Sequence, residues 1–263
     1  MPPYKFVTIC GLKVHIVQIP DIINFVECRI RERGSTAYIV TTNANTVVLA
    51  KNDPKIREAV NNSDLSIADG YSLVFLSRFY GDALKERAYG PDLMFEFLKI
   101  SEKNGYSNFF YGSTEETLRR LLKSLRSKFP RLRIAGCYSP PFRDSVCIDE
   151  DGVRTINSSN ADVLWVGLGG GRQELWMYEH KDKVDIPVLV GVGAAFDFFA
   201  GTKPQAPRWI RDNGFEWLFR LITEPNRLWH RYLVNNSLFI YYLGTEMLSR
   251  IFALKRFQSN GKN

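Results

Sequence analysis

The sequence lacks the cysteine and histidine groupings that bind metals or build disulfide frameworks. Among its 263 residues, the four cysteines (Cys10, Cys28, Cys137 and Cys147) are scattered without a CxxC pair, and the three histidines lie far apart. This spacing excludes the common zinc motifs and predicts reduced thiols, as in a cytosolic protein.

Long apolar runs are also missing. The N-terminal stretch MPPYKFVTIC has no apolar core typical of a signal peptide. No run approaches the roughly 20 apolar residues that span a bilayer, and the longest one near the C-terminus is 238–243. We therefore expect a chain that lies on a membrane surface, if it meets a membrane at all.

Acidic residues are scarce in the last quarter of the chain. Residues 203–263 contain ten Lys or Arg but four Asp or Glu, so they carry +6 of the total net charge of +7 and leave +1 for residues 1–202. Trp209, Trp217 and Trp229, three of the five tryptophans, lie in the same region. A basic, aromatic segment on a nearly neutral body predicts a surface for an anionic and partly apolar ligand, such as a membrane or a lipid-linked phosphate.

From residue 36 to residue 193, short β-rich apolar runs alternate with helical stretches. We expect strands at 36–41, 64–69, 107–112, 132–138, 161–169 and 186–193. We expect helices at 45–59 (interrupted near Pro54), 91–104, 114–127 and 171–183, with one more between the fourth and fifth strands. This alternation predicts an α/β fold with a mainly parallel sheet covered by helices on both faces.

The pattern changes after Ala200. Residues 201–209 contain two prolines and predict a linker or lid, and helices are expected at 214–222, 224–242 and 245–257. We therefore divide the chain into a core, 1–202, and a helical appendage, 203–263. The amphipathic spacing at 245–257 fits a cap that packs on the core, and it equally fits a helix that lies in a membrane interface.

Small, polar or acidic residues follow five of the predicted strands. These segments are 41–45, 69–70, 112–114, 167–174 and 191–197. Because ligands of open parallel sheets bind beyond the C-terminal ends of the strands, these segments predict a large polar cleft on one rim of the sheet.

Several of these motifs have two interpretations. GLGGG (167–171) fits a phosphate-cradling loop, but a tight strand–helix turn also needs glycine. Asp69 fits a catalytic base or the N-cap of a following helix. Asp197, between phenylalanines, is expected to have a hydroxyl or arginine partner. The DxD of Asp149 and Asp151 resembles a metal–diphosphate ligand pair, but its position favours a turn or helix cap.

Seven motifs in order resemble one known family. They are TTNAN (41–45), IADGYS (67–72), ERAYGPDL (86–93), GLGGGRQELW (167–176), GVGAAFDFFAGT (191–202), QAPRWIRDNGFEWLFRL (205–221) and TEPNRLWHRY (223–232). Together they resemble the WecG/TagA/CpsF glycosyltransferases, glycosyltransferase family 26, over roughly residues 5–235.

This resemblance implies an inverting, metal-independent glycosyltransferase with a Rossmann-like core, a C-terminal appendage and no cofactor. It implies transfer of N-acetylmannosamine or a related hexose from a UDP-sugar to a polyprenyl-diphosphate-linked saccharide. The reaction would serve bacterial cell-surface polysaccharide synthesis, with the enzyme peripheral to the cytoplasmic face of the cell membrane. Family members also self-associate, so a homo-oligomer is compatible with the resemblance.

The resemblance also assigns residues to roles. Asp69 corresponds to the proposed general base, and Thr41 and Asn43 line the same pocket. With the strand-end residues added, the predicted sugar-donor site comprises Arg87, Gly112, Gly169, Gln173, Glu174, Gly193 and Asp197. The predicted acceptor and diphosphate site comprises Arg208, Arg211, Arg220, Arg227 and Arg231. The family pattern is broken at 139–142, at Gly170-Gly171 and at Gln205, so the donor sugar is left open.

Three other classes compete with a glycosyltransferase. A non-catalytic, membrane-peripheral protein that binds a nucleotide-sugar or lipid phosphate would also use the basic appendage, but it would not require the polar strand ends. A nicotinamide-dependent dehydrogenase needs an early GxGxxG turn with an acid about 20 residues later, which the first strands lack. Charge alone would allow nucleic-acid binding, but no recognition motif supports it, and we expect no nucleic-acid partner.

Overall fold

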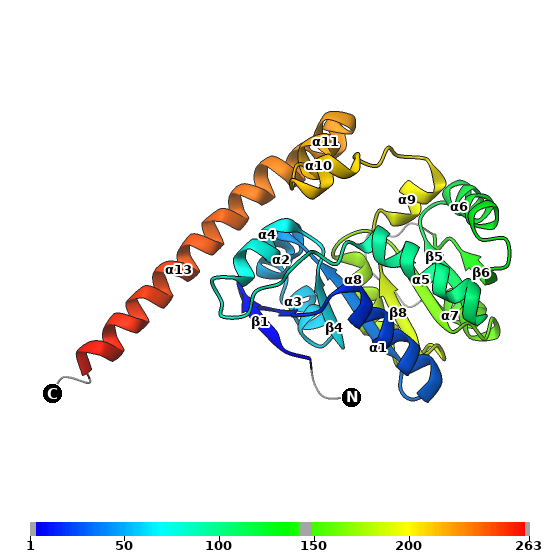
Figure 1. Cartoon of the computed structure of the whole chain (residues 1–263), viewed down its shortest axis with the longest axis horizontal. Helices are drawn as coiled ribbons and strands as arrows, with labels where there is room; N and C mark the ends of the chain where they lie inside the picture. The colour runs from blue at the N-terminus through cyan, green and yellow to red at the C-terminus, as the bar shows by residue number, and fades with distance from the viewer. Residues whose placement is uncertain (1–3, 142–148, 261–263) are drawn as a thin grey trace.

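The computed structural model describes residues 4–141 and 149–260, with side chains up to residue 250, and a six-stranded sheet forms its centre (Figure 1). The strands lie in the order β4-β3-β8-β7-β5-β6, and all neighbours are parallel. Their bounds are Ala37–Thr42 (β3), Leu65–Ala68 (β4), Ser107–Gly112 (β5), Arg133–Tyr138 (β6), Val163–Gly167 (β7) and Val188–Gly191 (β8). The predicted α/β, Rossmann-like fold is confirmed, with each of the six strands where the sequence placed it.

Helices cover both faces of the sheet, as the alternation of elements predicted (Figure 1). One face carries α1 (Ile19–Glu32), α5 (Gly90–Asn104), α6 (Glu115–Lys128) and α9 (Ala195–Ala200). The other carries α2 (Ala44–Asn52), α3 (Pro54–Asn61), α4 (Tyr71–Ser77), α7 (Glu150–Ser158) and α8 (Arg172–His180). Successive residues of β5 pack on opposite faces of the sheet: Phe109 and Tyr111 pack on the second face, and Phe110 packs on the first. Both faces are apolar, as expected of a parallel sheet buried on both sides.

An N-terminal hairpin was not predicted from the sequence. Its strands, β1 (Phe6–Ile9) and β2 (Leu12–His15), are antiparallel and only four residues long. His15 accepts a hydrogen bond from the backbone N–H of Ser66 through Nδ1 at 2.9 Å, so the hairpin covers the exposed edge of β4. Burial lowers the pKa of His15, in keeping with this acceptor role. Helix α1 and the short helices over 195–200 and 208–212 were also missing from the sequence prediction.

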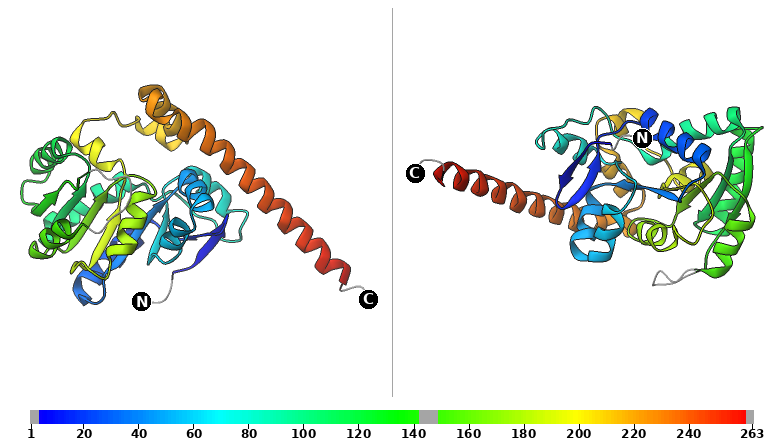
Figure 2. Two further views of the ribbon diagram at one scale, coloured as in Figure 1. Left: turned by 180° about the vertical axis from the view of Figure 1, so that it is seen from behind. Right: turned by 90° about the horizontal axis from the view of Figure 1, so that it is seen from below.

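The appendage begins with short helices and ends in one long helix. Its elements are α10 (Arg208–Asp212), α11 (Glu216–Thr223), α12 (Pro225–Trp229), a π-helical turn η1 (His230–Val234) and α13 (Asn235–Asn260). The prediction of two separate helices at 224–242 and 245–257 was wrong. Because Gly244 continues the helix instead of ending it, α13 is a single rod that runs past the body (Figures 1 and 2).

Buried side chains of α12, η1 and the start of α13 anchor the appendage to the core. Leu228, Tyr232 and Phe239 are buried, whereas Ile240 and Leu248 of α13 are exposed. The choice between a cap and an interfacial helix concerned residues 245–257, where Met247 and Leu248 are exposed, and it stays a prediction. The side chains of 251–257, which carry much of the predicted amphipathic face, lie outside the described residues.

Two negative findings concern membranes and thiols. Within residues 4–141 and 149–260, no helix has both the length and the apolar character needed to span a bilayer. Cys10, Cys28 and Cys137 are free thiols, as expected. Cys147 lies outside the described residues.

Candidate active site

Four adjacent strands, β4, β3, β8 and β7, bring the predicted polar segments together. The residues that follow them are 43–46, 69–72, 167–174 and 192–198, and they line two adjoining cavities. The fifth predicted segment follows β5, which lies on the far side of β7. Gly112, at the end of β5, lines neither cavity, and its role is steric instead. A Cβ there would lie 2.6 Å from the carbonyl oxygen of Gly167.

The segment after β3 both starts a helix and orients a site residue. Oδ1 of Asn43 caps α2 by accepting from the backbone N–H groups of Asn45 at 3.0 Å and Thr46 at 3.3 Å. This leaves Nδ2 to donate toward Oδ2 of Asp69 at 3.5 Å. Thr41 is buried, and its hydroxyl donates to the carbonyl of Gly191 at 3.1 Å. The TTNAN motif therefore joins β3 to β8 and to the segment after β4.

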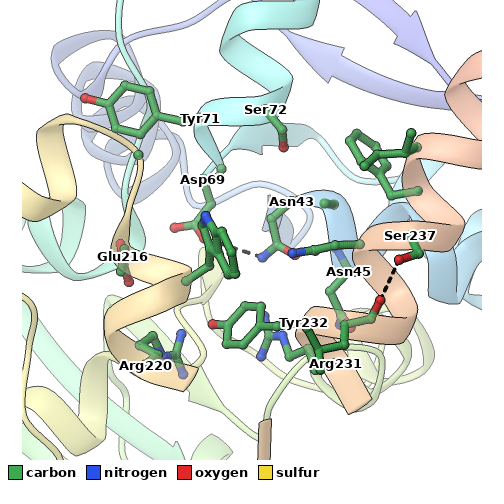
Figure 3. Close-up of a pocket in the computed structure, with 18 of the residues that line it drawn as sticks. Asn43, Asn45, Asp69, Tyr71, Ser72, Glu216, Arg220, Arg231, Tyr232 and Ser237 are labelled. Carbon is green, nitrogen blue, oxygen red and sulfur yellow. Dashed lines mark hydrogen bonds between the residues drawn. The ribbon is translucent and has the colours of Figure 1, made fainter. Parts of the chain in front are cut away.

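Asp69 lies partly buried at the wall between the cavities (Figure 3). The helix-cap interpretation is wrong for the helix that follows, because Gly70 is the N-cap residue of α4. Oδ1 of Asp69 instead accepts from the backbone N–H of Gly90, the first residue of α5, at 2.9 Å. Burial raises the pKa of Asp69; the bond from Gly90 opposes this shift, and Glu216 adds to it. A raised pKa suits a carboxylate that accepts a proton during a reaction.

Gln173 and Glu174 hold the glycine-rich turn after β7. Gly169 and Gly171 have positive φ angles of 87° and 83°, so the turn itself accounts for these two glycines. Oε2 of Glu174 accepts from the backbone N–H of Gly171 at 2.6 Å, and Oε1 of Gln173 accepts from that of Gly193 at 3.1 Å. Glu174 is fully buried, and burial raises its pKa to about 7. These two side chains brace the loops after β7 and β8, whose backbone faces a cavity.

Asp197 has a hydroxyl partner, one of the two that the sequence predicted, and its cationic partner is a lysine rather than an arginine. Its Oδ2 lies 2.5 Å from Nζ of Lys203, and its Oδ1 accepts from the hydroxyl of Thr202 at 3.2 Å. Lys203 also lies 4.0 Å from Glu224. Asp197 thereby ties the first residue of the appendage to α9.

The five predicted arginines of the appendage separate into two groups. Arg220 and Arg231 line both cavities, and Arg227 lines one. Arg208 is exposed and pairs with Asp212, and Arg211 pairs with Asp92 of α5 at 3.0 Å; neither lines a cavity. Only the first group therefore faces the space next to Asp69.

Arg220 and Arg231 lack an ion-pair partner within 4.0 Å among the described residues, and Nε of each is buried without a hydrogen-bond partner. Burial disfavours the charge of Arg220, but Tyr232 and Glu216 outweigh burial and raise its pKa, whereas burial dominates at Arg231. Burial lowers the pKa of Arg231, and Arg220 and Arg227 lower it further by repulsion. Burying a cation without a counter-ion is costly, so this cluster favours an anionic ligand. Arg231 belongs to η1, and π-helical turns occur frequently at functional sites.

Glu216, at the start of α11, is a site residue that the sequence did not identify. Its carboxylate accepts from Nη1 of Arg87 and from the hydroxyl of Tyr89, at 2.9 and 2.8 Å. Arg87 in turn stacks on the rings of Tyr89 and Tyr71. The GFEWLFRL motif contained Glu216, but its partners lie almost 130 residues earlier in the chain. Nothing in the local sequence indicated that pairing.

The two cavities differ in their walls. The glycine-rich cavity, about 240 Å³, is lined by backbone of Gly167–Gly170 and Gly193 with Arg227 and Lys203. The aromatic cavity, about 510 Å³, is walled by Tyr71, Trp217, Tyr232, Phe239 and Ile240. Six residues line both: Asn43, Asn45, Asp69, Glu216, Arg220 and Arg231. Figure 3 shows most of these shared side chains around one space.

The DxD motif of Asp149 and Asp151 contributes to a helix cap. Asp149 caps α7 by accepting from the backbone N–H of Gly152 at 3.1 Å, which confirms the helix-cap interpretation of the DxD. Across the part of the chain that the structure describes, no three His, Cys, Asp or Glu side chains form a group that could hold a metal ion.

Comparison with known proteins agrees with the resemblance seen in the motifs. The family model described as "Glycosyl transferase WecG/TagA/CpsF family" matches residues 7–252. Proteins from Bacillus spizizenii W23 and Bacillus subtilis 168 are 28% and 27% identical to this chain, over 82% of each chain. A Staphylococcus aureus NCTC 8325 protein is 30% identical over 73% of this chain and 74% of its own length. All three are named N-acetylglucosaminyldiphosphoundecaprenol N-acetyl-beta-D-mannosaminyltransferase.

Proposed function

The chain belongs to the WecG/TagA/CpsF family of glycosyl transferases, and we propose that it transfers a sugar from a UDP-sugar to a polyprenyl-diphosphate-linked saccharide. The names of its relatives favour N-acetylmannosamine as the sugar and N-acetylglucosaminyl-diphosphoundecaprenol as the acceptor. The observation that carries the proposal is the wall of six residues between the cavities. It presents one carboxylate with a raised pKa beside two arginines that have no ion-pair partner within 4.0 Å among the residues the structure describes.

The glycine-rich cavity is assigned to the UDP-sugar. Its backbone N–H groups lie in the turn before α8, where the helix dipole favours an anion. Arg227 and Arg231 add guanidinium groups, which bind phosphate through paired hydrogen bonds. Gln173 and Glu174 have their polar atoms engaged by the loops, so we assign them to holding this turn rather than to contacting the nucleotide.

The aromatic cavity is assigned to the lipid-linked acceptor. Trp217 and Tyr232 offer ring faces of the kind on which sugars pack, and Phe239 and Ile240 offer apolar surface to a prenyl chain. Exposed Ile240, Tyr241 and Leu248 continue this apolar character along α13. The assignment supports an enzyme that works at the inner face of the cell membrane, with the appendage against the lipid.

Asp69 is assigned as the general base. Its carboxylate takes the proton from the acceptor hydroxyl while that oxygen forms a bond to the anomeric carbon of the sugar. The bond from this carbon to the diphosphate oxygen breaks on the opposite side, so the configuration inverts and UDP leaves. Arg220 and Arg231 neutralise the charge that develops on the leaving diphosphate. In this scheme the arginines supply the positive charge, and no metal ion is required.

A UDP-release assay across UDP-sugars, with and without a short-chain prenyl-diphosphate N-acetylglucosamine, tests the proposal. We expect release that depends on the acceptor, is fastest with UDP-N-acetylmannosamine and is unchanged by EDTA. Loss of release on adding EDTA would contradict metal independence. Thermal stabilisation by UDP without any sugar transfer would instead support the non-catalytic binding protein.

A further inference from the structure

The carboxylate of Glu216 binds residues of the core rather than residues of its own helix. Its side chain and that of Arg87 are 12% and 11% exposed, and their charged groups are 2.9 Å apart. The second carboxylate oxygen accepts from the hydroxyl of Tyr89, which immediately precedes the first residue of α5. An ion pair this well shielded from water, with a further hydrogen bond on the carboxylate, holds its two elements in a defined arrangement.

The pair also determines which arginines are free to bind an anion. Arg87 is neutralised by Glu216 and held between the rings of Tyr71 and Tyr89, at 4.9 and 4.2 Å from their centres. Arg220 follows Glu216 by four residues, so both project from the same side of α11. When Glu216 binds Arg87, the side of α11 that carries both Glu216 and Arg220 faces the cavities.

We propose that Glu216 is a positioning residue for the transfer reaction: bound to Arg87 and Tyr89, it aligns α11 and Arg220 with the cavities and places a second carboxylate beside the base Asp69. The inference rests on the proposed function of Asp69. It adds to that function a specific link between the appendage and the ionisation of the base.

The charged groups around Asp69 fix the direction of the expected effect. They come from the segment before α5, from α11, from η1 and, across the glycine-rich cavity, from α8, α9, the segment after α9 and α12: Arg87, Tyr89, Glu216, Arg220, Arg231, Glu174, the Asp197–Lys203 pair and Arg227. Glu216 raises the pKa of Asp69, and Arg87 lowers it. Removing the negative charge of Glu216 leaves Arg87 uncompensated. Both changes let Asp69 act as a base at lower pH.

The test compares the pH dependence of kcat/KM for UDP release in the wild type and in Glu216→Gln. We expect the acidic limb to move down by about one pH unit in the variant. Arg87→Gln should move it up by a similar amount, and the double variant should restore it. Asp212→Asn, which removes an exposed acid of the same appendage, is the matched control and should leave the limb in place.

A direct measurement of Asp69 keeps this inference separate from the proposed function. The carboxyl carbon resonance of Asp69, identified by its loss in Asp69→Asn, should titrate at lower pH in Glu216→Gln whether or not the enzyme turns over. Superimposable titrations and pH profiles would overturn the inference. Absence of UDP release in the wild type, with a shifted titration, would overturn only the catalytic role of Asp69. Because Glu216→Gln and Arg87→Gln should shift the titration of Asp69 in opposite directions, either single variant supplies the result if the other one unfolds.

Discussion

Asp69 is the residue on which the proposed chemistry depends. Asp69→Asn keeps an oxygen for the backbone N–H of Gly90 but removes the basic carboxylate. We expect turnover to fall at least 100-fold with little change in UDP affinity, since general-base catalysis contributes about 10²–10⁴-fold. UDP release and calorimetric UDP titration measure the two effects. Asp82→Asn, at an exposed position, is the control. A fall of less than tenfold would remove Asp69 from the role of base.

Arg231 illustrates how a functional residue can oppose stability. It is half-buried with its Nε shielded from water, lines both cavities and has no carboxylate within 4.0 Å among the described residues. We expect Arg231→Met to reduce transfer by about 10²–10³-fold, because the leaving diphosphate loses a positive group. The same change should raise the free energy of unfolding by about 1 kcal/mol, because a buried unpaired charge is removed. Activity and thermal unfolding are measured together.

Arg208→Met is the matched control for this prediction, because Arg208 is exposed on α10 and lines neither cavity. It should change neither property. Unaltered transfer in Arg231→Met, or a large loss of its stability, would show that Arg231 serves the fold rather than the reaction.

Among the elements, those defined by local pattern were predictable and those defined by distant contacts were not. Strand β5 was predicted at its observed bounds because SNFFYG contains three consecutive aromatic residues and lies between a glycine-containing turn and a capping threonine. The hairpin of β1 and β2 was missed because each strand is four residues long and is stabilised by packing against β4. The predicted break near Gly244 was wrong. Tyr242 and Glu246, on either side of Gly244, hydrogen-bond to Asn52 and to the backbone of Cys10, and α13 continues through Gly244.

The residues of the site show the same contrast: those placed by local sequence pattern were predicted, and those that depend on distant contacts were not. Thr41, Asn43 and Asp69 could be placed together because parallel strands end on one edge of a sheet. Gly112 satisfied that rule as well, but the strand order put it beyond β7, away from the cavities. Strand order depends on crossover connections, and the sequence pattern does not specify it. Glu216 was missed for a related reason, since the significance of a carboxylate in the appendage depends on Arg87 in the core.

Gly112 provides a test at the level of the sheet. It has φ of +116°, and a Cβ would meet the backbone of Gly167 in β7. We expect Gly112→Ala to lower the free energy of unfolding by at least about 2 kcal/mol, because β5 and β7 must separate. Denaturant unfolding measures the loss. Folded Gly112→Ala should keep its UDP affinity, and weaker UDP binding would return Gly112 to the sugar-donor site.

Gly105→Ala is the control for the steric part of this effect. Gly105 also has a positive φ, +76°, but open space surrounds the position of its Cβ. Only the backbone preference is lost there, at about 1 kcal/mol.

For the whole molecule, the division into a core and an appendage is tested by truncation. Deleting residues from 203 onward removes Arg220, Arg227 and Arg231 from the cavities. We expect transfer to be abolished while the core still folds, with a lower melting temperature because Phe239 no longer covers its apolar neighbours. Circular dichroism melting and UDP release measure the two outcomes.

Deleting only residues 251–263 should keep transfer to a short-chain acceptor in solution, because the cavities are intact. Full transfer by the chain without residues 203–263 would contradict the assignment of the arginines.

The π-helical turn η1 sets the rotational phase of the last helix. A π turn contains one residue more than an α turn, so every residue after it is rotated by about 100° from its position on an uninterrupted α-helix. Tyr232 faces the cavity within the turn, and Phe239 then meets the core seven residues later. Regular α winding of these same residues would rotate Phe239 by about 100° away from the core, whereas loss of one residue between His230 and Val234 would restore regular winding with Phe239 still toward the core. The π turn is therefore what allows a segment of this length to place Tyr232 at the cavity and Phe239 against the core.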